Sequence, residues 1–295
     1  MRYTVFHETK YLYDTNVTLS QQMLHMKPRS FALQQCEWYG LNISPKPNEH
    51  IERLDYFGNH SDYIAVFSPH KMITVSSSST INLKPRLRLS ELQNSQPWEM
   101  VKQLLNTEQT LHTEAIAYLF TSTNVICEPD LATYAAPSFY ANRPLIDAVY
   151  DLTQRVFNEF EFDDEATDVS TPLDEVLAGK RGVCQDFAHL MIGCLRSLGL
   201  ACKYVSGYIL TTPPEGKPRL IGADASHAWI SVYCPNYGWI DFDPTNNCLV
   251  QNQHITVAWG RDFSDVSPMH GMVLGGGKQR LKVSVTVTPI LSKTA

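Results

Sequence analysis

The chain has 295 residues, of which 43 % are hydrophobic and 18 % are charged, a composition typical of a folded globular protein. Its formal net charge of −6 offers no basic surface, so neither nucleic acid nor an anionic membrane is expected as a partner. The length allows one large domain or two domains of medium size.

The first residues, Met1 to Lys10, lack the apolar run and the small-residue cleavage site of a secretory signal. No segment approaches the ~18 consecutive apolar residues that a spanning helix needs. The seven cysteines form no Cys-x-x-Cys pair, which argues against structural zinc, and their odd number favours reduced thiols over a disulfide framework. We therefore expect a cytoplasmic protein with no metal and no other cofactor.

Short β-favouring runs separated by turn residues make up the first part of the chain. These runs are Tyr3–His7, Val17–Met26, Cys36–Ile43, Asp62–Phe67 and Met72–Leu83. The pattern predicts an antiparallel N-terminal β domain over residues 1–90, in the form of a β-sandwich.

From Pro97 onward, the apolar residues recur at helical spacing. Helices are predicted at Trp98–Asn106, Thr113–Phe120, Pro144–Phe160 and Thr171–Leu177. A further apolar period begins at Cys184 and ends before Gly199, a residue typical of helix C-termini. This segment is predicted to be a central buried helix.

Beyond that helix, the chain returns to strand-like patterns. The predicted strands are Ala201–Leu210, Ala228–Cys234, Gly238–Asp243, Ile255–Trp259 and Arg280–Thr288. Helices followed by a run of strands favour an α+β architecture, and residues 91–295 are assigned to a second domain. The connection Asp262–Gly277, which contains three consecutive glycines, is expected to be a long loop.

Cys184 is a candidate nucleophile because of its position at the start of a predicted helix. The positive end of a helix dipole favours the thiolate, and a backbone N–H there can stabilise an oxyanion. Gly182, two residues earlier, is expected to leave room for a substrate chain. On local sequence alone, a buried structural cysteine is an equally good interpretation.

The base for this thiol must come from elsewhere in the chain. Helical geometry places Asp186 ~200° and His189 ~140° around the helix from Cys184, so neither faces it, although the two can pair with each other. His227 opens a predicted strand and is the strongest remaining histidine.

A carboxylate that could orient His227 lies on the following strand. Asp241 and Asp243 both project from one face of that strand, and the two strands can form a hairpin. Geometry from the sequence does not separate the two aspartates. A cysteine, a histidine and an aspartate in this order can act as nucleophile, base and orienting group.

Three ordered segments resemble the signature segments of the transglutaminase-like superfamily, whose core is similar to that of papain. The segments are Gly182–Ala188, His227–Trp229 and Trp239–Thr245. The resemblance spans roughly residues 145–250. In addition, the first eighty residues resemble the β domain that precedes this core in bacterial transglutaminase-like proteins of the cysteine protease type.

The resemblance implies a helix that carries the cysteine and packs on an antiparallel sheet. It also implies Cys184 as nucleophile, His227 as base and Asp243 as orienting residue, with no motif for a second oxyanion donor. The expected activity is that of a cysteine peptidase or amidase, a hydrolase that cleaves a peptide or isopeptide amide in a peptide or protein substrate through a thioester. The alternatives are a protein-glutamine γ-glutamyltransferase and a non-catalytic binding module that retains the triad. The oligomeric state is left open.

Overall fold

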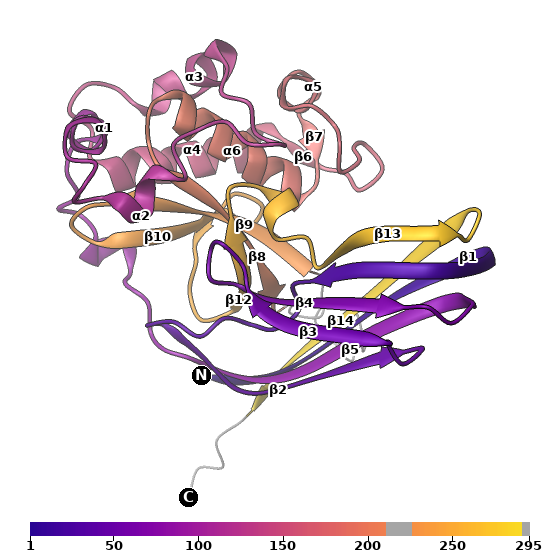
Figure 1. Ribbon diagram of the computed structural model, residues 1–295. Coiled ribbons are helices and arrows are strands. Elements are labelled where there is room, and N and C mark those ends of the chain that lie inside the picture. Colours follow the sequence, from indigo (N-terminus) through magenta and orange to yellow (C-terminus); the bar gives the residue numbers. More distant parts are fainter. Residues whose placement is uncertain (211–225, 291–295) are drawn as a thin grey trace, which may run out of the picture.

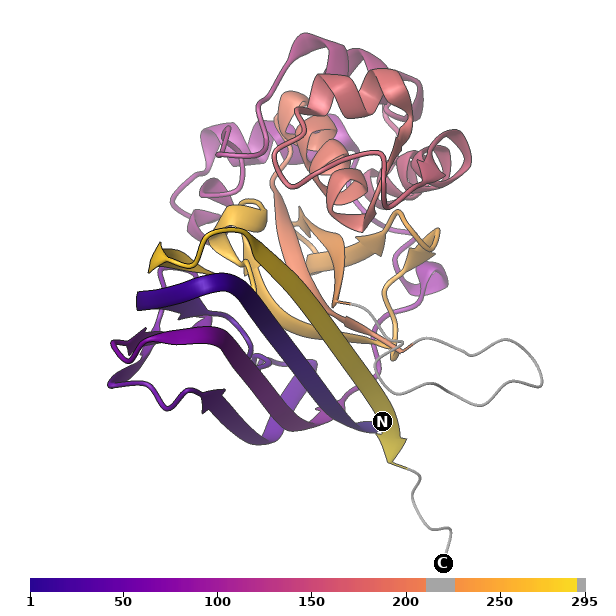
Figure 2. The same cartoon turned by 90° about the vertical axis from the view of Figure 1, so that its right-hand side faces the viewer.

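The computed structural model describes residues 1–210 and 226–290. A group of helices lies over a five-stranded antiparallel sheet, and a seven-stranded sheet built largely from N-terminal residues lies beside it (Figures 1 and 2). The predicted α+β architecture with an N-terminal β region is therefore confirmed. None of the described helices combines the length and the apolar character needed to cross a bilayer.

The seven-stranded sheet is organised around its longest strand, β1. Its strands are β1 (Arg2–Leu24), β2 (Gln34–Ser44), β3 (Glu49–Leu54), β4 (His60–Val66), β5 (His70–Leu83), β13 (Met269–Gly275) and β14 (Gln279–Ile290). The first half of β1 pairs with β5 and β14, and its second half pairs with β4 and β13. The pairing with β5 shifts register between Leu12 and Val17, which separates the two halves.

The two halves of this sheet share one apolar core. Ile64 from β4 and Ile73 from β5 are fully buried in the same cluster, although their strands pair with different halves of β1. The predicted sandwich is thus a single folded sheet. Strand β1 runs through both of its halves and keeps its hydrogen bonds in each of them.

The last strands of the chain return to this N-terminal sheet. The sequence predicts a long loop over residues 262–277, and that prediction is wrong, because Met269–Gly275 pairs with β1 as β13. Gly275, Gly276 and Gly277 have φ of +91°, +88° and +63° and form the turn into β14. The division of the chain at residue 90 stays a prediction, but residues 269–290 extend the N-terminal sheet from outside the first predicted domain.

The five-stranded sheet has the order β11-β10-β9-β8-β12. Its strands are β8 (Cys202–Ile209), β9 (Ser226–Cys234), β10 (Gly238–Asp243), β11 (Cys248–Leu249) and β12 (His254–Gly260). A short parallel pair is formed by β6 (Glu161–Phe162) and β7 (Arg181–Gly182). The helices are α1 (Trp98–Thr107), α2 (Thr113–Ile116), α3 (Pro129–Ala135), α4 (Leu145–Glu159), α5 (Leu173–Gly179) and α6 (Cys184–Ser197), with short 3₁₀ turns η1 (Leu89–Glu91), η2 (Ala136–Ser138) and η3 (Phe263–Asp265).

Helix α6 is the central element of the core. Every residue of α6 from Asp186 to Arg196 is buried, and the helix packs on β8 and β9. At its C-terminal end, the buried Arg196 guanidinium donates to the main-chain oxygens of Cys202 and Arg261, so its N–H groups have acceptors within the core. This packing sets the position of α6, and with it that of its first residue, Cys184.

Candidate active site

The start of α6 is fixed by the carboxylate of Asp186. Its Oδ2 accepts hydrogen bonds from the Val183 N–H at 2.8 Å and from the Thr167 hydroxyl at 2.6 Å. A Cβ on Gly182 would lie 2.6 Å from the same oxygen. The glycine therefore makes room for Asp186, which corrects the expectation that it makes room for a substrate chain.

Cys184 and His227 meet at one cavity. The partly buried Cys184 and the buried His227 both line a space of about 410 Å³, and the imidazole lies within hydrogen-bonding reach of the thiol. Burial alone would lower the pKa of His227, but its hydrogen bonds to Asp243 and Cys184 and their negative charges raise it to about 10. The site thus favours the charged imidazolium form of His227.

Asp243 is the carboxylate that reaches His227. It is fully buried, and its Oδ2 accepts from His227 Nε2 at 2.7 Å, from the Asn246 side-chain amide at 2.7 Å and from His254 Nε2 at 2.9 Å. Its Oδ1 accepts from the main-chain N–H groups of Thr245 and Asn246. Burial would raise the pKa of this carboxyl, but these hydrogen bonds hold it well below its usual range.

These contacts determine which nitrogen of His227 can react. Because Nε2 donates to Asp243, Nδ1 is the nitrogen left to exchange a proton with the Cys184 thiol. Asn246 Nδ2 also lies 3.2 Å from His227 Nε2, but both are N–H donors, so the amide donates to Asp243 instead.

Sequence reasoning missed His254, which donates to the same Asp243 oxygen from the start of β12. Its Nε2 lies 2.9 Å from Asp243 Oδ2, and its ring packs edge-on against Trp229. Strands β10 and β12 are separated by β9 and β8 in the sheet order, so only a strongly curled sheet brings the two residues together. Neither spacing nor periodicity in the sequence could reveal that closure.

His227, Asp243 and His254 also lie close enough together to suggest metal ligands. Two ligands of a tetrahedral zinc ion are separated by roughly 3.3 Å, given zinc–ligand distances of about 2.0–2.1 Å. The observed separations of 2.7 Å and 2.9 Å are shorter and fit direct hydrogen bonds. We therefore treat the group as a hydrogen-bonded cluster.

Asp241, the other aspartate that the sequence allowed as the partner of His227, has a different environment. Asp241 Oδ2 accepts from Arg86 Nη1 at 2.7 Å and from Trp229 Nε1 at 3.3 Å. Asp186 and His189, which the sequence allows to pair, have separate partners, since His189 Nε2 accepts from the Phe263 N–H at 3.1 Å. Their roles are structural.

Part of the wall of the Cys184 cavity comes from the seven-stranded sheet. His7, Thr9 and Tyr11 contribute from β1, and Leu281 and Val283 contribute from β14. His7 Nδ1 lies 2.8 Å from the Tyr208 hydroxyl of β8, so a buried hydrogen bond ties this wall to the core sheet. The cavity is thus formed jointly by the β region and the core.

Comparisons with known proteins agree on the relationship of both regions. A model of the transglutaminase-like superfamily matches residues 133–244, and a model of the bacterial transglutaminase-like N-terminal region matches residues 3–82. An uncharacterized protein of Mycobacterium tuberculosis is 39% identical over 302 residues, which cover 98% of this chain and 93% of that protein.

Two further proteins bear on the fold and on the chemistry. A crystal structure described as a "Putative Cysteine Protease" from Cytophaga hutchinsonii has a TM-score of 0.77 at 20% identity and covers 100% of this chain and 92% of its own, which confirms the fold. A protein-glutamine gamma-glutamyltransferase of Pseudomonas aeruginosa is 33% identical over 75 residues, which make up 25% of this chain and 11% of that protein.

Proposed function

Since the chain belongs to the transglutaminase-like superfamily, we propose that it is a thiol-dependent acyl-transfer enzyme that cleaves a peptide or isopeptide amide through a thioester on Cys184. The observation that carries this proposal is the contact series from Cys184 to His227 to Asp243 at the edge of one cavity. If Cys184 only filled the core, its half-buried thiol would not need a charged histidine beside it.

In the first half of the reaction, the Cys184 sulfur attacks the carbonyl carbon of the amide. His227 Nδ1 holds the proton that the thiol has given up and transfers it to the leaving amine, which departs as the C–N bond breaks. Asp243 keeps Nε2 protonated throughout and stabilises the imidazolium. The acyl group remains on sulfur as a thioester.

The developing oxyanion needs hydrogen-bond donors beside the sulfur. The N–H groups of the first turn of α6 have no intrahelical acceptors and point out of the helix start. Tyr204 lines the same cavity, and burial, followed by the charge of Cys184, raises the pKa of its hydroxyl well above its usual range. This hydroxyl therefore stays protonated, and we assign it as the second donor, for which the sequence offered no motif.

In the second half, His227 activates the nucleophile that resolves the thioester. Water gives a carboxylate product and a hydrolase, which agrees with the description of the Cytophaga hutchinsonii protein as a cysteine protease. An amine gives a transferase, and the local similarity to the Pseudomonas aeruginosa gamma-glutamyltransferase supports this second candidate. We favour hydrolysis, with a peptide or protein as the substrate.

The position of the N-terminal β region at the cavity suits it to select the substrate. Tyr11, Leu281 and Val283 face the space in front of Cys184 and present apolar surface to whatever enters it. A substrate with an apolar side chain next to the scissile amide would bury that side chain against this wall. We propose that the β region sets specificity while α6, β9 and β10 supply the chemistry.

The test is to incubate the protein with a library of blocked peptide amides in H₂¹⁸O, with and without a primary amine, and to analyse products by mass spectrometry. Products that carry ¹⁸O identify a hydrolase, and amine adducts identify a transferase. Cys184→Ala, which removes the sulfur with little change in volume, is the matched control. Turnover that persists in Cys184→Ala would contradict the proposal.

A further inference from the structure

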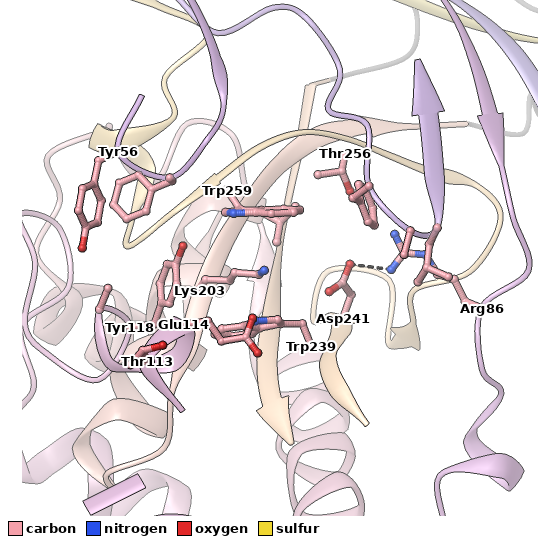
Figure 3. A pocket seen from close by; sticks show the side chains of 16 residues that line it. Tyr56, Arg86, Thr113, Glu114, Tyr118, Lys203, Trp239, Asp241, Thr256 and Trp259 are labelled. Carbon is pink, nitrogen blue, oxygen red and sulfur yellow. Dashed lines mark hydrogen bonds and ion pairs between the residues drawn. The ribbon is translucent and has the colours of Figure 1, made fainter. Parts of the chain in front are cut away.

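A second cavity, separate from the one at Cys184, lies between the β region and the core sheet (Figure 3). Its volume is about 730 Å³, which falls within the range of sites for small organic molecules. The two cavities have no lining residue in common among the described residues. Six of its 16 lining residues are aromatic, among them Tyr56, Tyr118, Trp239 and Trp259.

Lys203 lies in the middle of this cavity. Its Nζ is 3.8 Å from the centroid of the Trp259 ring and 4.1 Å from that of Trp239, so the amine is held between two indoles (Figure 3). The residue is only 5% exposed, and no carboxylate within the described ranges 1–210 and 226–290 forms an ion pair with it. Burial lowers the pKa of Lys203 to about 7, although Asp241 nearby acts in the opposite direction.

Arg86 presents an unpaired donor on the wall of the same cavity. Its Nη1 pairs with Asp241 at 2.7 Å, but its Nη2 is buried and has no hydrogen-bond partner among residues 1–210 and 226–290. The Arg86 side chain is 10% exposed, so solvent does not readily supply that partner. A buried guanidinium N–H without an acceptor is costly, at about 1–3 kcal/mol, and such a group indicates a missing acceptor.

We propose that this cavity binds an organic carboxylate with an aromatic body. The carboxylate accepts hydrogen bonds from Lys203 Nζ and Arg86 Nη2, and the aromatic body packs among the rings of the wall. An anion supplies an ion-pair partner for Lys203 and an acceptor for Arg86 Nη2, neither of which the residues described by the structure provide. Such a group can belong to a free aromatic acid or to the C-terminus of a peptide that ends in an aromatic residue.

One side chain, that of Trp229, lies between this cavity and the cluster around Asp243. Trp229 donates to Asp241 at 3.3 Å on the cavity side, and its ring lies 5.2 Å from that of His254 on the other side. Trp229 is fully buried, so the two sites are separated by packed protein rather than joined by open space. The binding proposal does not depend on the proposed acyl transfer.

Isothermal titration calorimetry on the full chain tests the proposal. The probes are 3-phenylpropionate for the free acid and glycyl-phenylalanine for the peptide C-terminus, each compared with its neutral amide. Because a charge-assisted hydrogen bond contributes strongly, we expect each amide to bind at least about 10-fold more weakly than the better acid. The relative affinity of the two acids identifies the source of the carboxylate.

Two variants locate the binding. Lys203→Met keeps an unbranched chain between the indoles and removes the charge, and Arg86→Lys keeps the pair with Asp241 while it removes the second N–H. Each is expected to weaken acid binding by about 10-fold or more, whereas Glu114→Gln, at the rim, should not weaken it. Failure of both acids to bind at millimolar concentration, equal binding of acid and amide, or full affinity in a folded Lys203→Met would each overturn the proposal.

Discussion

Replacing Asp243 by asparagine should separate the chemistry of the cluster from its packing. Asparagine has the shape of aspartate, but one of its two terminal groups becomes an N–H₂ donor. If its oxygen keeps the main-chain N–H groups of Thr245 and Asn246, its N–H₂ faces His227 Nε2 and His254 Nε2, which are donors themselves. His227 must then move its proton to Nδ1, the nitrogen that should accept the thiol proton.

The expected loss in rate follows from this change of tautomer. The same substitution in the serine protease triad lowers kcat by about 10⁴, or about 5 kcal/mol of transition-state stabilisation. We expect a loss of about 10³–10⁴ here, because His227 also loses the hydrogen bond to Asp243 that raises its pKa. Asp241→Asn should leave the rate per folded molecule within about 10-fold, but cost stability of about 3 kcal/mol, because it leaves the Arg86 charge uncompensated.

The rate of alkylation of Cys184 by iodoacetamide measures this effect without a known substrate. In Asp243→Asn, the rate at pH 6 should fall toward that of an ordinary cysteine, of which less than about 1 % is thiolate at that pH. In Asp241→Asn, the rate should stay near that of the wild type. A larger loss in Asp241→Asn than in Asp243→Asn, at equal folded fraction, would refute the assignment of Asp243.

Three other predictions concern the same region. Cys184→Ser should abolish turnover and leave the unfolding temperature nearly unchanged, as measured by calorimetry, since the swap conserves volume; a large loss of stability would point to a structural cysteine. His254→Phe should cost about 1–3 kcal/mol in chemical denaturation, because it removes a donor from a buried carboxylate, whereas His254→Gln, which can still donate, should cost less; equal losses would contradict the hydrogen-bond account. Burial lowers the pKa values of His7 and His189 to about 4, below the value of about 6.5 in the unfolded chain. As the pH falls from 6.5 to 4, the unfolded chain therefore binds protons that the folded chain does not, and the free energy of unfolding should fall by about 3 kcal/mol for each histidine. A flat stability profile over that range would be inconsistent with both histidines being buried and neutral.

Much of the fold could be predicted from local pattern. The apolar period that begins at Cys184 predicts α6, and the alternation in Gly238–Asp243 predicts β10 with the bounds that the structure has. These signals succeed because each element buries one face, and burial selects residues at the period of that element. The predicted strands Tyr3–His7 and Val17–Met26 lie largely within one strand, β1, because pairing with four partners keeps the chain extended between them.

The remainder depends on contacts between residues that are distant in the sequence. The three glycines at 275–277 led to the prediction of a loop over residues 262–277, yet the main chain of β13 pairs with β1 at the other end of the chain. His254 reaches Asp243 only because the sheet curls, and Lys203 is enclosed only because Trp239 and Trp259 come from separate strands. No local sequence pattern indicates contacts between residues so distant in the chain.

The seven cysteines allow a direct test of whether Cys184 is the reactive thiol. Burial raises the pKa of most of the others, to about 12 for Cys194, Cys202 and Cys248. Cys127 is partly exposed and serves as the internal reference.

The decisive measurement is the rate of iodoacetamide adduct formation at each cysteine of the native protein at neutral pH, followed by peptide mass spectrometry. Our account predicts that Cys184 is modified well before Cys127, and that this preference is lost in His227→Ala. Slow modification of Cys184 at the same rate as Cys127, unchanged in His227→Ala, would contradict the assignment of Cys184 as a nucleophile and favour a non-catalytic binding module.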